Sequence, residues 1–265
     1  MNLPGRIASI CYLLFACALP AMAQKAIVLR TNGKQITADS ITADAQGNLT
    51  YKDGSVMQKI RRSDYRWARI PKPKEIAAVE QLIRSNKFPE AAAQARALYD
   101  QFKFLGYDVN LIYLETMCLV RAGKDAEALP RLELLNDTKV ADLDQQKISQ
   151  FFECRKLQAD LYIKGKQFDN ASKILTELLA AQDDNLVAFA LNAQGEILYT
   201  QNKKRDATLM FLRTVLLFPK ENKERPRALV RVANTLKEMS DNRSAIFIEM
   251  LQKDYPGSSF IQELK

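Results

Sequence analysis

The chain has 265 residues, of which 47% are hydrophobic and 26% charged, with only 9 Gly and 9 Pro. This composition is typical of a globular protein with enough apolar mass for a core, and it argues against long disordered tracts. The sequence contains no histidine, which excludes His-based acid–base catalysis, Ser-His and Cys-His nucleophiles and the commonest zinc ligand.

The N-terminal segment, residues 1–23, has the three parts of a secretory signal peptide. Arg6 supplies a positive charge, residues 7–19 are apolar, and Ala21-Met22-Ala23 is a small-x-small cleavage site. The apolar stretch is too short to span a bilayer as a helix. We therefore expect a periplasmic or secreted protein, cleaved between Ala23 and Gln24.

Export also bears on the four cysteines. Cys11 and Cys17 leave with the signal peptide, unless the chain is a lipoprotein attached at Cys17 or keeps the segment as an uncleaved anchor. Cys118 and Cys154 remain, each within an apolar helical pattern. They are interpreted as two buried small hydrophobic residues or as one disulfide formed in an oxidising compartment. They cannot make a structural zinc site alone, and no metal or cofactor is expected.

Residues 24–74 are interpreted as a small basic β-module, with four or five short strands in a meander or barrel-like sheet. Strand-like runs such as Ala26–Arg30 alternate with turn dipeptides such as Asn32-Gly33 and Asp53-Gly54. Residues 25–74 carry 11 Lys and Arg against 4 Asp, whereas residues 75–265 carry 27 basic and 27 acidic residues. The net charge of +8 therefore belongs almost entirely to this module.

A basic patch with one aromatic member is expected at the end of the β-module: Arg61, Arg62, Arg66, Trp67 and Arg69. It is interpreted either as a solvated edge that discourages strand addition, or as a contact for an acidic protein, an anionic cell-wall polymer or an anionic lipid. Nucleic acid is not expected as a partner of an exported chain. Because so small a module buries little surface on its own, we expect it to pack against the helical part.

Residues 75–265 are predicted to form paired amphipathic helices, because apolar residues recur at helical spacing throughout. Each pair has a turn with Gly, Asn or Asp, followed by a small alanine that lets two helix backbones approach closely. These alanines are Ala91, Ala128, Ala171, Ala207 and Ala245. Their spacings of 37, 43, 36 and 38 residues are typical of a solenoid of helical hairpins.

The fourth unit has Gly195, Ala207, Phe211 and Pro219 at the positions of a tetratricopeptide repeat (TPR), and the fifth ends in Asp254-Tyr255-Pro256-Gly257-Ser258. The chain resembles TPR proteins of the bacterial cell envelope, such as the repeats of outer-membrane assembly lipoproteins and of the cell-division coordinator of the Tol–Pal system. The resemblance implies a mainly α fold, a TPR-like α-solenoid of about five helical hairpins behind the β-module. It specifies fold far better than function.

If the repeat register holds, the first helices of the pairs line a concave face suited to an extended peptide or a partner helix. The expected inner positions are Asn110, Tyr113, Met117, Glu153, Lys156, Asp160, Phe189, Asn192, Glu196, Tyr199, Arg227, Asn234 and Lys237. The resemblance implies that Asn192, Asn234, Arg227 and Lys237 are candidates to clamp a carboxylate or a peptide backbone. The alternative is that individual members are solvated polar residues.

The sequence has no Gly-rich phosphate loop, no serine nucleophile elbow and no metal-ligand cluster, so we expect a protein that is not an enzyme. The leading hypothesis is a periplasmic scaffold that binds other envelope proteins or peptides within a complex of the cell envelope. The second is a cell-wall or carbohydrate-binding protein, in which Tyr51, Tyr65 and Trp67 of the β-module contact the polymer. The third is a hydrolase with an unrecognised active site.

Overall fold

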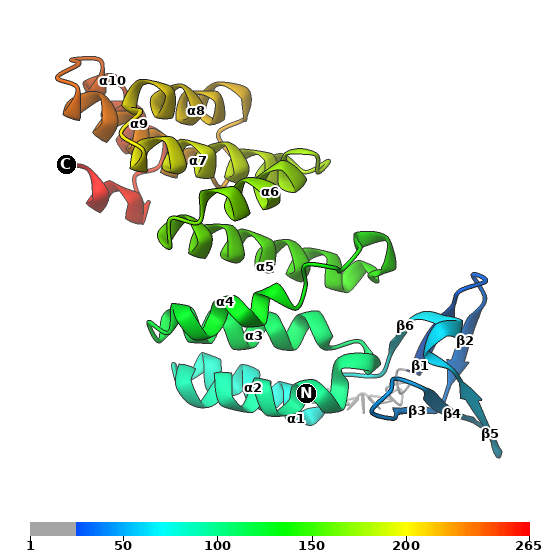
Figure 1. The fold of residues 1–265 in the computed structure, drawn as a ribbon. Helices are drawn as coiled ribbons and strands as arrows, with labels where there is room; N and C mark the ends of the chain where they lie inside the picture. The colour runs from blue at the N-terminus through cyan, green and yellow to red at the C-terminus, as the bar shows by residue number, and fades with distance from the viewer. Residues whose placement is uncertain (1–24) are drawn as a thin grey trace, which may run out of the picture.

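The structure, a computed structural model, describes residues 25–265. The predicted signal peptide, the Cys17 alternative and the Ala23-Gln24 cleavage site lie outside the described residues. Within the described part, six short strands precede ten helices that stack in pairs (Figure 1). None of the helices between residues 25 and 265 is both long and apolar enough to cross a membrane.

The N-terminal module consists of two three-stranded antiparallel sheets, with strand orders β2-β1-β6 and β3-β4-β5. The strands are β1 (Ala26–Arg30), β2 (Gln35–Ala38), β3 (Ser40–Ala43), β4 (Leu49–Asp53), β5 (Val56–Ile60) and β6 (Tyr65–Arg69). The chain passes from the first sheet to the second at Asp39, whose carboxylate accepts a hydrogen bond from Gly54 N–H at 3.0 Å. This break produces six strands where the sequence predicted four or five.

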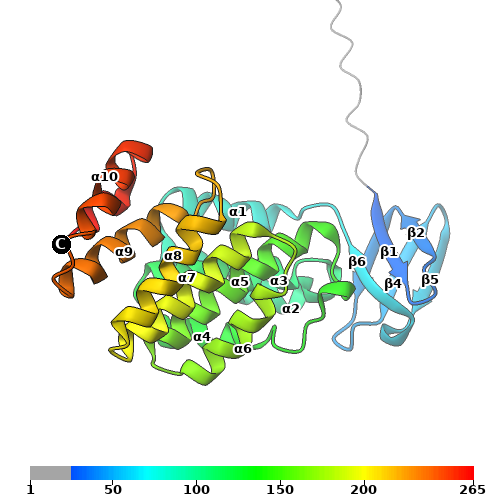
Figure 2. The same cartoon turned by 90° about the horizontal axis from the view of Figure 1, so that it is seen from above.

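The β-module shares one hydrophobic core with the first helices, and Figures 1 and 2 show it against one end of the helical stack. Val28 and Leu49 belong to the same buried cluster as Ile76 of α1 (Lys74–Arg84). Gly106, which follows α2 (Phe88–Phe102), has a φ of 97°, and a Cβ there would lie 2.9 Å from the Ala68 carbonyl oxygen. Glycine therefore permits both the left-handed backbone and the close approach of β6.

The helices form the five predicted hairpins. After α1 and α2 they are α3 (Asp108–Arg121) with α4 (Asp125–Glu133), α5 (Gln145–Lys164) with α6 (Phe168–Leu179), α7 (Asp184–Thr200) with α8 (Lys204–Leu217), and α9 (Arg225–Glu238) with α10 (Ser244–Asp254). The longest interval between repeats is the connection from α4 to α5, which contains a short 3-10 helix at Val140–Asp142. Another 3-10 helix, η4 (Ser259–Glu263), follows α10.

Each hairpin turn contains one residue with left-handed backbone, and these residues repeat at the predicted spacing. They are Asn86, Gly123, Lys166, Asn202 and Ser240, with φ between 56° and 74°. Gly and Asn adopt this conformation most readily. In the third and fifth turns, however, the strained position falls on Lys166 and Ser240, beside the Gly165 and Asp241 that the sequence singles out as helix breakers.

Four of the five predicted alanine anchors, in the first four hairpins, are completely buried. Ala245 is exposed, so the prediction that it anchors the fifth hairpin by close helix packing was wrong, although the hairpin itself is present. The chain enters α10 through a turn with i→i+3 hydrogen bonds, including Ala245 N–H to the Asn242 carbonyl at 3.3 Å. This tighter winding changes the rotational register of α10, and Phe247 packs against the core instead.

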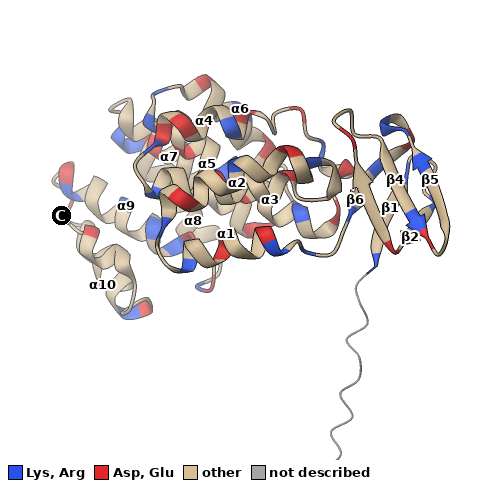
Figure 3. Cartoon of the chain, turned by 90° about the horizontal axis from the view of Figure 1, so that it is seen from below, with Lys and Arg blue, Asp and Glu red and all other residues tan. Residues whose placement is uncertain are grey.

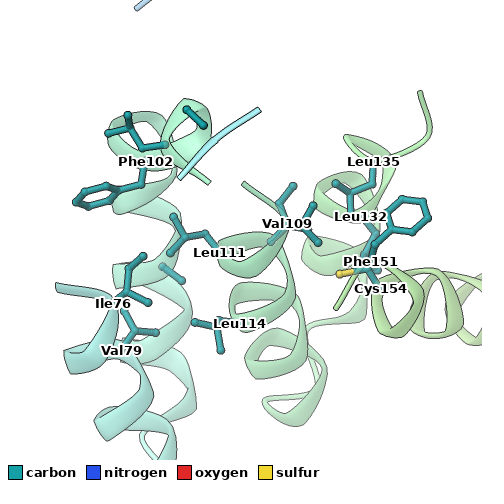
Figure 4. Packing of buried hydrophobic residues seen from close by; sticks show 14 of the residues in the cluster. Ile76, Val79, Phe102, Val109, Leu111, Leu114, Leu132, Leu135, Phe151 and Cys154 are labelled. Carbon is teal, nitrogen blue, oxygen red and sulfur yellow. The ribbon is translucent and has the colours of Figure 1, made fainter. Parts of the chain in front are cut away.

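Close packing of the solenoid core is visible in Figure 4, where Ile76 and Val79 lie across from Leu111 and Leu114. Cys154 lies beside Phe151 in the same core, and Cys118 is also buried. Both thiols are free, and burial raises the pKa of Cys154 to about 12. Of the two interpretations left open by the sequence, the structure has buried thiols and no disulfide between them.

Candidate functional site

The first helices of four successive hairpins, α3, α5, α7 and α9, line a common hollow of about 360 Å³. Seven of its lining residues are predicted inner positions: Tyr113, Met117, Glu153, Lys156, Asp160, Phe189 and Arg227. Its other lining residues, which sequence reasoning missed, are Val120, Arg121, Leu157 and Glu224. They lie three or four residues from predicted positions, so helical periodicity could have found them. We call these eleven residues the inner groove.

The groove combines an apolar surface with charged residues. Tyr113 and Met117 on α3 are half-buried, and Phe189 on α7 is 2% exposed and forms part of the floor. The ammonium group of Lys156 lies 5.2 Å from the centre of the Phe189 ring, a favourable cation–π distance. An apolar surface edged by charges can bury large side chains of a ligand while polar groups fix its orientation.

Two of the three cations in the groove have acidic partners. Lys156 pairs with Glu153 on the same helix at 3.3 Å, and Arg227 lies 3.8 Å from the carboxylate of Glu196. The third, Arg121, is exposed at the edge and lies 5.2 Å from the centre of the Phe88 ring. The cations of the groove are therefore largely compensated within the chain.

Asp160 on α5 differs from these charges, because within residues 25–265 its carboxylate has neither a hydrogen bond nor an ion pair. Burial raises the pKa of Asp160 to about 6. Glu224 and Glu196 raise this pKa further by repulsion, while Arg227 and Lys156 lower it from a greater distance than an ion pair. The groove thus contains one carboxylate whose charge the chain does not balance by direct contact.

Asn192, Glu196 and Tyr199 on α7 connect this helix to α9 and are not free inner positions. Asn192 is completely buried, and its amide donates to the Glu224 carbonyl at 3.0 Å. Its role as a ligand clamp is therefore corrected to that of a structural contact with the start of α9. Glu196 pairs with Arg231 as well as Arg227, and the Tyr199 hydroxyl donates to Glu238 at 2.8 Å.

Asn234 and Lys237 on α9 hold the backbone of the chain's own residues 263–265. The Asn234 amide donates to the Glu263 carbonyl at 2.8 Å and accepts from Lys265 N–H at 3.0 Å. Lys237 donates to the Lys265 carbonyl. The two predicted clamp residues thus contact a peptide backbone, supplied in this structure by the last residue of η4 and by Lys265.

The remaining inner position, Asn110, lies outside the groove, in a cleft of about 410 Å³ between the β-module and the helices. Its side-chain oxygen is buried without a partner among the described residues. Arg69 lines the same cleft, and its guanidinium lies 3.8 Å from the Asp144 carboxylate.

The other residues of the predicted basic patch lie elsewhere on the β-module. Arg62, Arg66 and Trp67 line a second cleft, of about 300 Å³, together with acidic residues of the helical part such as Asp108. Arg61 is exposed and lines neither cleft. Figure 3 shows basic residues on strands of the β-module, and residues of both charges along the helices. Four of the five patch residues are therefore divided between two clefts of mixed charge, and Arg61 lies outside both.

Two of the three aromatic residues that a polymer-binding β-module would use lie in the core. Tyr51 is 7% exposed and Tyr65 is 3% exposed. The Tyr65 hydroxyl donates to the Gly47 carbonyl at 2.6 Å, and burial raises the pKa of Tyr65 to about 12. Trp67 is the partly exposed member. These rings do not form a stacking platform.

Comparison with known proteins agrees with the helical part being a TPR-like α-solenoid. The apo form of the quorum sensor NprR from B. thuringiensis has a TM-score of 0.56 at 15% identity over 72% of this chain. The match covers 56% of NprR, so the chain corresponds to little more than half of that protein. MamA from Desulfovibrio magneticus RS-1 has a TM-score of 0.50 at 13% identity, covering 70% of this chain and 95% of that one.

A further match is YrrB, described as a TPR protein with an unusual peptide-binding site, with a TM-score of 0.46 at 13% identity. It covers 71% of this chain and 89% of YrrB. No protein-family model and no curated protein sequence matches the chain. At such low identities the matches to NprR and MamA show the fold alone, and the ligand has to be inferred from the groove.

Proposed function

We propose that this chain is an exported scaffold of the cell envelope whose inner groove holds a segment of a partner protein. One observation carries the proposal: the first helices of four hairpins line a single hollow of about 360 Å³, which has an apolar floor and charged edges. TPR-like solenoids present extended concave surfaces of this kind, and such a surface suits an extended peptide or an amphipathic helix.

Export is proposed from the sequence of residues 1–23, with its positive start, apolar stretch and small-x-small site. The mass of the mature chain, measured after fractionation of the cell, tests it. We expect a chain that begins near Gln24 in the periplasmic or secreted fraction. A cytosolic chain that still contains residues 1–23 contradicts export.

The β-module supplies a second contact surface in this proposal, through the clefts beside Arg69 and Trp67. Their mixed charge suits a protein surface better than a uniformly anionic polymer, because acidic side chains such as Asp108 and Asp144 repel polyanions. No observation favours binding to cell-wall polymer as a second function.

The partner-binding role is tested by affinity purification of the full chain from its native envelope, with quantitative comparison of variants. We expect the Tyr113→Ala, Met117→Ala double variant to lose the partner, because it removes the apolar side of the groove on α3. Leu216→Ala is the matched control, since Leu216 is 77% exposed on α8 and lies outside the groove. Equal recovery of every co-purifying protein with both variants contradicts the proposal.

A further inference from the structure

Asp160 is the residue of the inner groove whose carboxylate charge is not balanced by any contact within the described residues. It lies among Tyr113, Met117 and Phe189, in surroundings that oppose its ionisation, and no cation of the described chain contacts it. Asp160 is half-buried, and a carboxylate that is partly removed from water without a partner is costly to a fold. The neighbouring cations, Lys156 and Arg227, have acids of their own.

At the other end of the same helical face, α9 holds a segment of the chain's own backbone. Along α9, Leu264 packs against the core of the last repeat while Asn234 holds the backbone on either side of it. The next side chain, Lys265, places its ammonium on Glu238 at 2.5 Å. The features that α9 contacts in this segment are therefore a large apolar residue, a pair of backbone hydrogen-bonding groups and a basic side chain paired with the carboxylate of Glu238.

From these two observations we propose that the inner groove selects a partner segment with a Lys or Arg next to a large apolar residue. The basic group pairs with Asp160. The apolar side chain packs on Tyr113, Met117 and Phe189. The inference rests on the proposed function and names the chemistry of its ligand. A basic group at Asp160 supplies the partner that the carboxylate lacks, and apolar walls strengthen the pairing by excluding water. An acidic side chain at the position of this basic group is disfavoured, because Asp160 and Glu224 both line the hollow.

The probe is a random peptide library displayed on phage and selected on the full-length mature protein. We expect enrichment of Lys or Arg beside aromatic or aliphatic residues on the wild type, and loss of the basic preference on Asp160→Asn. Glu249→Gln is the control, because it removes one carboxylate that is exposed on α10 and lies outside the inner groove. This control should keep the basic preference.

A selected peptide, resynthesised with norleucine in place of its basic residue, gives the quantitative test. We expect its affinity for the wild type to fall by about tenfold or more, and its affinity for Asp160→Asn to change little, because the charge-assisted contact is already absent. This inference is overturned if the selected peptides are not enriched in Lys or Arg, or if norleucine lowers peptide affinity equally for the wild type and for Asp160→Asn. Either result leaves the groove as a binding site. If no peptide competes with the natural partner for the groove, the proposed function fails as well.

Discussion

The side-chain amide of Asn234 donates to the backbone carbonyl of Glu263 at 2.8 Å and accepts from the N–H of Lys265 at 3.0 Å. One asparagine on a first helix thus satisfies a donor and an acceptor of an extended backbone, from a position that is 5% exposed. The contact ties the segment after η4 to the last repeat and covers part of α9. It also shows that the face continuous with the inner groove is chemically suited to peptide backbone.

Asn234→Ala is predicted to release residues 259–265 from α9. The substitution removes both backbone hydrogen bonds, each worth about 1 kcal/mol, and exposes the apolar contact of Leu264. Hydrogen exchange followed by mass spectrometry should show faster exchange in peptides that cover this segment. Asn242→Ala, at an exposed turn residue, serves as the control and should leave the exchange unchanged.

Acid is predicted to weaken the same contact through Glu238. The hydrogen bond from Lys265, with further bonds from Tyr199 and Lys204, lowers the pKa of Glu238 to about 2. A depressed carboxyl pKa contributes stability above its unfolded value, near 4.3, and loses it as pH falls towards the folded value. Thermal unfolding of wild type and Glu238→Gln should therefore differ at pH 6 and converge near pH 2. A difference that persists at pH 2 contradicts this account.

Asp160 is predicted to have the opposite pH dependence to Glu238, lowering the stability of the fold as pH rises. Burial raises the pKa of Asp160 to about 6, so its ionisation costs stability as pH rises from about 4 through 6. Asp160→Asn should stabilise the free protein by about 2 kcal/mol at pH 7, and by much less at pH 4. Denaturant unfolding at the two pH values measures the difference. Equal effects at both pH values mean that Asp160 has a partner that balances its charge.

Gly195→Ala is predicted to disrupt the fourth repeat. An added Cβ would lie 2.4 Å from the Phe211 ring, so α7 and α8 must separate, and such overpacking costs about 1–3 kcal/mol. Gly165→Ala is the control: its Cβ would meet the nearest backbone atom at 3.4 Å, and its φ is negative. Thermal unfolding should separate the two variants, and equal melting temperatures contradict the packing assigned to Gly195.

The helical repeat could be predicted because it depends on local features, namely helical periodicity and a turn every 36 to 43 residues. Gly195 and Phe211 were found from their match to the positions of a tetratricopeptide repeat, and in the structure the Phe211 ring packs closely against Gly195. The rotated start of α10 escaped prediction, since the Asp241–Ser244 turn can wind in more than one way. The passage of the chain from the first sheet to the second at Asp39 was also not predicted, because only contacts between the two sheets distinguish it from a continuous strand.

In the candidate site, too, features set by local helical spacing could be predicted, and features set by contacts distant in the sequence could not. Seven inner positions converge because helical spacing fixes the face on which each side chain lies. Asn192 and Asn234 could not be assigned from spacing alone, since their partners, Glu224 and Glu263, lie about 30 residues away along the chain. The unpaired state of Asp160 likewise depends on which cations the neighbouring helices have already engaged.

Site-specific photo-crosslinking tests the central claim most directly. A benzophenone amino acid placed at Val120 or Glu153 in the inner groove is compared with one at Leu216, exposed on α8 outside the groove. In the native envelope, the account predicts a discrete protein adduct from the groove positions and none from Leu216. An adduct only from Leu216, or none from either groove position while the partner still co-purifies, would contradict it.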